Sequence, residues 1–257
     1  MKFEKYFKKR TDKIDLLLKK TARTFTPWDF HQLRIEIKKI NALFIFIAFS
    51  EKDFKKRSVF KPYKLIFTAA GKVREYQMEE AVFKKHFGQK KFTQYQTDLK
   101  KSELLEKRKF FTGVNASLKK DLKRSNKIAL SFLKKLKTKD LSEYLKMKRV
   151  KIKKTLNKKQ LKQKEIHQLR KDLKICYYNA KILGKRSKYS LVKMEKLQEL
   201  LGKWHDGIVM NNHLKKMIKF LKQNSNESKH LKKIRKEISY KTKTLYKSID
   251  NERRNFI

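Results

Sequence analysis

The sequence is poor in the residues that break or cross-link a chain. Its 257 residues include six glycines, two prolines and one cysteine. So few glycines and prolines argue against a β-sandwich, a β-barrel or a long disordered linker. A single cysteine excludes an intramolecular disulfide, and we expect Cys176 to be a buried structural thiol. Apolar residues make up 39% of the chain and recur with helical spacing. We therefore predict an all-α protein with long helices.

Acidic residues are also scarce, at 25 against 72 lysines and arginines, which gives a formal net charge of +47. Biased composition can explain why lysine outnumbers arginine, but not why acids are so outnumbered. A field of this size opposes compaction and attracts polyanions. The partner is expected to be nucleic acid, inorganic polyphosphate or an anionic surface.

Long apolar runs are missing as well. The longest, residues 42–49, is far shorter than the roughly 20 residues that cross a membrane. The first 20 residues lack the apolar stretch and cleavage site of a signal peptide. We expect no membrane span and a cytoplasmic location.

One motif occurs twice. HQLRIEIKK begins at His31, and HQLRKDLKI begins at His167, 136 residues later. On a helix each copy forms an apolar stripe beside a basic stripe. The apolar stripes are Leu33, Ile37, Ile40, Phe44 and Ile47, then Leu169, Leu173, Cys176, Ala180 and Leu183. The basic stripes are His31, Arg34 and Lys38, then His167, Arg170, Lys174 and Lys181. Two such rows suggest one anion site built from two halves.

The segments around the motif repeat too. Residues 141–158 parallel 3–20, and Gly202–Asp206 parallel Gly71–Glu75. The offsets of 138, 136 and 131 residues drift only by loop-sized steps, which indicates an internal duplication. We predict repeats at about 1–138 and 139–257, forming two pseudo-twofold-related four-helix bundles packed as one unit and one domain, 1–257.

Helix signals support this division. Helices are predicted over 3–20, from Thr26-Pro27 to Ser50, from Pro62 to Gly88, over 92–111, 113–138 and 141–158, from His167, through 197–214, and over 227–254. Loops are predicted at 51–58 and 184–187. Gly71 lies inside a helix, where glycine costs about 1 kcal/mol, so we expect a packing reason for it, such as a close helix crossing.

An H-x-x-R-x-x-x-[KR] motif on the second helix of each repeat and an L-G-x-x-R-D element on the third resemble the CHAD domain, the conserved histidine α-helical domain. The resemblance covers nearly the whole chain and rests on His31, Arg34, Lys38, Lys39, Gly71, Arg74 and Glu75, and on His167, Arg170, Lys174, Gly202, His205 and Asp206. It implies a helical domain whose basic residues bind inorganic polyphosphate, in some members at polyphosphate granules with granule-associated proteins. The E-x-E-x-K element of the triphosphate-hydrolysing domain fused to some members does not occur here, so a stand-alone binding module is expected.

The resemblance implies a polyphosphate-binding set, and to it we add the lysine beside each third-helix glycine and Lys181 as a substitute cation. The set is His31, Arg34, Lys38, Lys39, Lys72, Arg74, His167, Arg170, Lys174, Lys181, Lys203 and His205. The chain departs from the family pattern at Asn41, Ile175, Tyr177 and His205, where the family tends to have basic residues or, at His205, arginine. The centre of the site is therefore expected to be less cationic.

Other interpretations stay open. Each histidine could be a core residue, and the motif cations could be a solvated helix face. No paired carboxylates, phosphate loop or nucleophile–base pair points to an enzyme. No metal-ligand spacing occurs, and no cofactor is expected. The alternative function is non-specific binding of DNA or RNA, which the net charge alone would support.

Overall fold

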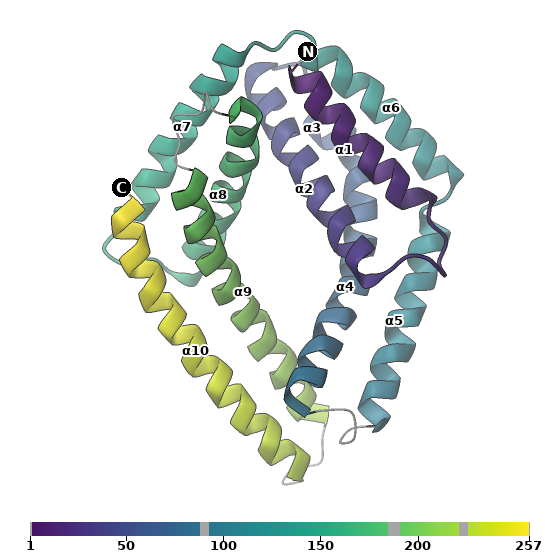
Figure 1. Ribbon diagram of the computed structural model, residues 1–257, viewed down its shortest axis with the longest axis vertical. Coiled ribbons are helices and arrows are strands. Elements are labelled where there is room, and N and C mark those ends of the chain that lie inside the picture. Colours follow the sequence, from purple (N-terminus) through teal and green to yellow (C-terminus); the bar gives the residue numbers. More distant parts are fainter. Residues whose placement is uncertain (1, 88–92, 185–190, 221–225, 257) are drawn as a thin grey trace. The chain divides into compact units, whose positions relative to one another are not determined.

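All of the described structure is helical. The computed structural model describes residues 2–87, 93–184, 191–220 and 226–256, and within these ranges it has ten helices and no strand (Figure 1). This confirms the predicted all-α class. The chain divides into two compact units, Met1–Tyr144 and Leu145–Ile257. The predicted pseudo-twofold relation between the halves stays a prediction.

Unit 1 is built around the helix that carries the first motif. Its elements are α1 (Lys2–Lys19), α2 (Pro27–Ser50), α3 (Lys56–Val59), α4 (Lys61–Phe87), α5 (Thr93–Gly113), α6 (Ala116–Leu133) and the start of α7 (Thr138–Leu156). Helix α2 packs against α1 and α4, and α4 packs against α5 (Figure 1). The predicted apolar stripe is buried throughout, with Leu33, Ile37, Ile40, Phe44 and Ile47 fully covered.

The start of α2 is fixed by a capping box. The Thr26 hydroxyl accepts a hydrogen bond from the Asp29 backbone N–H at 3.2 Å, and the Asp29 carboxylate accepts one from the Thr26 N–H at 2.8 Å. Pro27 occupies the first turn, where its missing N–H costs nothing. These caps set the rotation of α2, and with it the direction in which the motif residues point.

One predicted loop is wrong in its second half. The segment 51–58 contains the turn α3, in which the Phe60 N–H bonds to Lys56 O at 2.9 Å. Burial of Val59 holds this turn against the core, a tertiary contact that no periodicity announces in four residues. The predicted helix end at Gly88 and the loop residues 185–187 lie outside the described residues.

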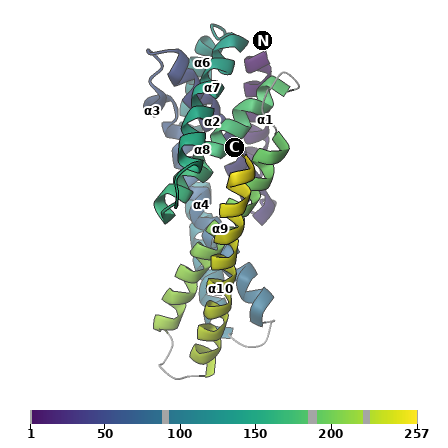
Figure 2. The ribbon, with the colours of Figure 1, turned by 90° about the vertical axis from the view of Figure 1, so that its left-hand side faces the viewer.

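Unit 2 contains the rest of α7 with α8 (Gln163–Leu183), α9 (Leu191–Phe220) and α10 (Asn226–Phe256). Helices α9 and α10 lie side by side in both ribbon views (Figures 1 and 2). Gly207 permits this close approach, because a Cβ there would lie 2.3 Å from Thr242 Oγ1. The buried Arg253 donates to the carbonyls of Leu156, Lys158 and Lys159, which ties the end of α10 to the end of α7.

Candidate functional site

Arg34 joins the motif helix α2 to α4 in unit 1. Its Nη1 donates a 2.6 Å hydrogen bond to Phe67 O, and its guanidinium carbon lies 3.9 Å from the centre of the Phe67 ring. A charged hydrogen bond combined with cation–π contact holds the side chain in one place. The guanidinium has five N–H donors, so this anchored group can also present donors to an anion.

Gly71 is the residue that lets Arg34 reach this position. A Cβ at Gly71 would lie 2.3 Å from Arg34 Nη1 and 3.2 Å from its Cζ. The packing reason expected for this mid-helix glycine is therefore a side chain of the motif itself. Gly71 and Arg34 work as a steric pair across the α2–α4 contact.

Further motif residues surround Arg34. The Lys38 Nζ lies 5.7 Å from the centre of the Phe67 ring. Burial lowers the pKa of Arg34, the nearby Arg74 lowers it further, and Glu75 opposes both. Burial also lowers the pKa of Arg74. Partly desolvated cations attract an anion more strongly than cations in bulk water, so the α2–α4 face is suited to anion binding.

Arg74 is oriented from the neighbouring helix α5. Its Nη1 lies 3.4 Å from the Gln77 side-chain oxygen, and the Gln77 nitrogen donates to Glu103 Oε1 at 2.8 Å. The chain of contacts extends from the α2–α4 face to α5. Sequence reasoning did not find Gln77 or Glu103, because both act through Arg74.

Lys39 lies with a different group of charges. Its Nζ is 2.7 Å from Glu36 Oε1, and Glu36 is fully buried between α1 and α2. Arg10 and Lys13 from α1 also approach Glu36, at 3.1 and 3.7 Å. We call Glu36, Arg10, Lys13 and Lys39 the Glu36 cluster. Lys39 is thus oriented by Glu36, while Arg34 is oriented by Phe67 and Gly71.

Two other predicted residues of unit 1 lie apart from Arg34's anchor. The His31 ring lies 5.5 Å from the ring of the exposed Trp28. Lys72 follows Gly71 and is exposed on α4. Neither has a printed bond to Phe67, and their predicted role in binding stays a prediction.

Unit 2 brings its motif residues together on the α8–α9 face. The rings of His167 and His205 stack with their centres 5.2 Å apart and their planes at 24°. Burial lowers the pKa of Lys174, Arg170 lowers it further, and Asp206 raises it. This face therefore gathers both histidines with Arg170, Lys174 and Asp206.

The two acids of the third-helix element have similar effects. Glu75 stabilises the charged form of Arg34, and Asp206 does the same for Lys174. Asp206 Oδ1 also lies 3.5 Å from His205 Nδ1. These interactions support the expectation that each acid acts on a neighbouring cation.

Unit 2 differs from unit 1 at the glycine. A Cβ at Gly202 would meet nothing within 4 Å, so Gly202 makes no room for an arginine. Lys203 pairs with Glu199 at 2.7 Å on an exposed surface. Lys181 lies 4.3 Å from the centre of the Tyr177 ring, away from the stacked histidines along α8. The halves repeat the sequence motif but not all of its contacts.

Sequence reasoning missed two residues on which the site depends. Phe67 anchors Arg34, and a signal was present, because Phe67 lies one helical turn before Gly71 on the same face. Glu36 lies among apolar residues of α2 and is buried. An acid on a core-facing position in so basic a chain is a signal for a buried ion pair.

Metal and membrane features were also searched for. Within the described ranges, no group of three or more His, Cys, Asp or Glu side chains could hold a metal ion. Among the same residues, no helix combines the length and apolar character needed to cross a membrane.

The fold and these two basic helix pairs define an all-α protein with a repeated cationic motif. Residues 5–215 match the model of the CHAD domain family, and the chain belongs to that family. The family is associated with polyphosphate binding in general. The crystal structure of the CHAD domain from the plant Ricinus communis is similar, with a TM-score of 0.78 and 12% identity over 98% of this chain and 90% of that chain. This likeness shows a shared fold. A sequence search of curated proteins found no match.

Proposed function

We propose that the protein binds inorganic polyphosphate through the α2–α4 and α8–α9 faces and does not hydrolyse it. The observation that carries the proposal is that each face holds partly desolvated motif cations at fixed positions. Arg34 is anchored on Phe67 in one unit, and Lys174 lies beside Arg170 in the other. Membership of the CHAD family supports polyphosphate as the anion.

The chemistry of the ligand fits such faces. Polyphosphate is a flexible linear anion without bases, so spaced cations are enough to bind it. Arginine can bind phosphate oxygens in pairs, and lysine binds as a point charge. Binding releases counterions, which predicts a steep dependence on salt by analogy with DNA. The same reasoning places the protein in the cytoplasm, at polyphosphate granules with their associated proteins.

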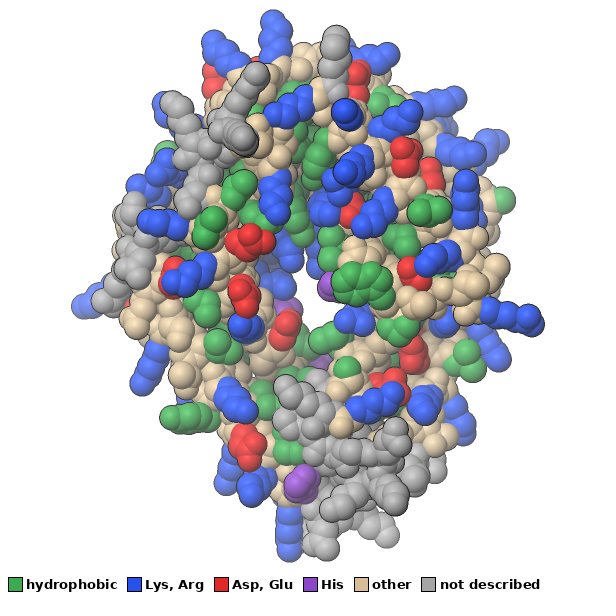
Figure 3. Space-filling view, viewed as in Figure 1, with side chains coloured by type: hydrophobic (Ala, Val, Ile, Leu, Met, Phe, Trp, Pro, Cys, Tyr) green, Lys and Arg blue, Asp and Glu red, His purple; other side chains and the backbone are tan. Residues whose placement is uncertain are grey.

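Net charge favours a second candidate, non-specific nucleic-acid binding. Lysines and arginines are scattered over the face of each unit drawn in Figure 3, and acidic side chains are fewer. Such a surface would hold DNA or RNA whatever the motif does. A competition experiment separates the two functions. Long-chain polyphosphate should displace duplex DNA from the protein at equal charge concentration and moderate salt.

A pair of variants tests the role of the motif. Arg170→Gln combined with Lys174→Gln removes two charges from the α8–α9 face. Lys100→Gln combined with Lys120→Gln removes two charges from exposed positions elsewhere. We expect the motif pair to weaken polyphosphate binding about tenfold more than the control pair, since desolvated contacts contribute more. Equal losses, or displacement of polyphosphate by DNA, would contradict the proposal.

A further inference from the structure

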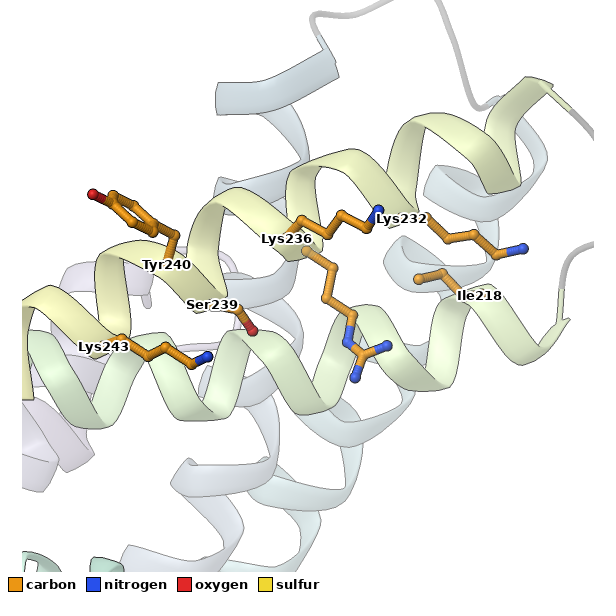
Figure 4. Close-up of a pocket in the computed structure, with 7 residues that line it drawn as sticks. Ile218, Lys232, Lys236, Ser239, Tyr240 and Lys243 are labelled. Atoms are coloured by element: carbon orange, nitrogen blue, oxygen red, sulfur yellow. The ribbon is translucent and has the colours of Figure 1, made fainter.

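A basic groove lies between α9 and α10, outside the family motif. Its volume is about 580 Å³, and its lining residues are Ile218, Lys232, Arg235, Lys236, Ser239, Tyr240 and Lys243. Figure 4 shows Lys232 and Ile218 at one end and Lys243 at the other, with Lys236 and Ser239 between them. We call it the α10 groove. All seven residues follow residue 215, where the family match ends.

The charges of the groove have one sign and form a row. Four of the seven lining residues are cations, and none is acidic. Lys232, Lys236 and Lys243 lie four and seven residues apart, which keeps them on one side of α10. At 1.5 Å per residue the row extends about 16 Å. A single phosphate can reach neighbouring cations only, whereas a linear anion can contact the whole row.

Arg235 shows that the groove is more than a solvated helix face. Its side chain is half-buried, and its Nε is covered without a hydrogen-bond partner in the described part of the chain. A buried N–H donor without a partner costs about 1–3 kcal/mol, which a bound oxyanion would recover. Ser239 donates to Asn211 Oδ1 at 3.2 Å, so its position between α10 and α9 is fixed.

The groove and the motif lie on different sides of α9. His205 stacks on His167 of α8, whereas Gly207 faces Thr242 of α10. Two residues on a helix are separated by about 200°. Ile218, thirteen residues after His205, points to the α10 side by the same rotation and lies about 20 Å further along the axis. An anion in the groove therefore does not occupy the α8–α9 face.

The groove suits a phosphate chain better than a nucleic acid. Proteins that hold single strands stack successive bases on aromatic side chains. Tyr240 is the one aromatic residue of the lining, and its ring points away from α9 (Figure 4). A base would find no platform within the groove, whereas an oxyanion chain would find four cations.

We propose that the α10 groove is a second binding site for a linear inorganic phosphate chain. Together with the α8–α9 face it gives the protein two separate contacts, so that one molecule can bridge two chains or two parts of one chain. Bridging of this kind cross-links long polyphosphate into a condensed phase. This inference rests on the proposed function and adds a site and a consequence to it.

The experiment compares two triple variants of equal charge. Lys232→Gln, Lys236→Gln and Lys243→Gln remove the exposed cations of the groove. Lys100→Gln, Lys120→Gln and Lys127→Gln remove three exposed lysines of α5 and α6. Both variants carry +44 in place of +47, three charges fewer. Calorimetry with tripolyphosphate gives the number of sites, turbidity with long chains reports condensation, and thermal unfolding checks the fold.

We expect the groove triple to lose one tripolyphosphate site and to stop condensing long chains while still binding them. The slope of log affinity against log salt should fall by about two in the groove triple and by less than about one in the control, given about one unit per lost phosphate contact. Equal effects of the two triples, or the same number of sites in the groove triple and the wild type, would overturn the second site. Equal binding of a single-stranded DNA oligomer at the groove would overturn the phosphate-chain assignment. A wild-type protein that binds no phosphate chain would refute the proposed function as well, so the two failures are distinguishable.

Discussion

Adding a methyl group at Gly71 should have the opposite effect on stability from adding one at Gly202. Both glycines lie inside long helices and at equivalent places in the repeated motif. In each helix alanine is favoured over glycine by about 1 kcal/mol. At Gly202 nothing opposes this gain, because a Cβ meets open space. Gly202→Ala is therefore expected to stabilise the protein by up to about 1 kcal/mol.

At Gly71 the same gain is outweighed. The new Cβ would lie 2.3 Å from Arg34 Nη1, so the guanidinium must leave its place. It then loses the hydrogen bond to Phe67 O, worth about 1.5–3 kcal/mol for a charged donor, and a cation–π contact worth about 0.5–1 kcal/mol. Against the helix gain of about 1 kcal/mol, Gly71→Ala should destabilise the protein by about 1–3 kcal/mol.

A double-mutant cycle isolates the cause. Chemical unfolding is measured for Gly71→Ala in the wild type and in an Arg34→Ala background, with Gly202→Ala as the matched control. Without the arginine there is nothing to displace, so Gly71→Ala should become neutral or stabilising. Polyphosphate affinity should fall in Gly71→Ala and stay unchanged in Gly202→Ala. An equal loss of stability in both backgrounds would refute the steric pair.

Three further outcomes are expected. Glu36→Gln should destabilise the fold by about 3–5 kcal/mol, because it leaves buried cations without their carboxylate; Lys39→Gln should cost under about 1 kcal/mol, and urea unfolding compares the two. Burial, with Lys171, His205 and Arg170 nearby, lowers the pKa of His167, so its neutral form stabilises the fold above the unfolded pKa of about 6.5 and this is lost as pH falls through the folded pKa. A bound polyanion raises that pKa, so polyphosphate affinity should increase as pH falls from about 7.5 to 5.5, less so in His167→Gln; an equal increase in that variant would contradict this role. Burial raises the pKa of Cys176 to about 12, so alkylation at pH 8 should be far slower in the folded protein than in urea, and fast labelling of the folded protein would show that the thiol is accessible.

Much of the helix order could be predicted, because each helix announces itself locally. Thr26 and Pro27 predicted the start of α2, and the stripe from Leu33 to Ile47 predicted its buried face. The turn α3 could not be predicted, because four residues have no period and Val59 is held by contacts from elsewhere. Local signals thus give elements, while tertiary contacts decide what happens between them.

The site divides in the same way. Helical spacing predicted that Arg34 and Lys38 share a face, and both lie near Phe67. It could not show that Lys39, one position further, bonds to Glu36. That contact depends on Arg10 of α1, 26 residues away from Glu36 in sequence. Seven of the lining residues of the α10 groove were likewise invisible as a site, because lysines are common throughout the chain.

The Glu36 cluster has a consequence for how the sequence can change over evolutionary time. Three cations share one carboxylate, so the loss of any single cation leaves two that can still neutralise it. The carboxylate has no such substitute, since the three cations bring none of the opposite sign. In a chain that has drifted so far toward lysine, this makes basic positions around α1 and α2 tolerant of mutation and the single acid intolerant. Glu36 marks a limit to how basic this chain can become and still fold.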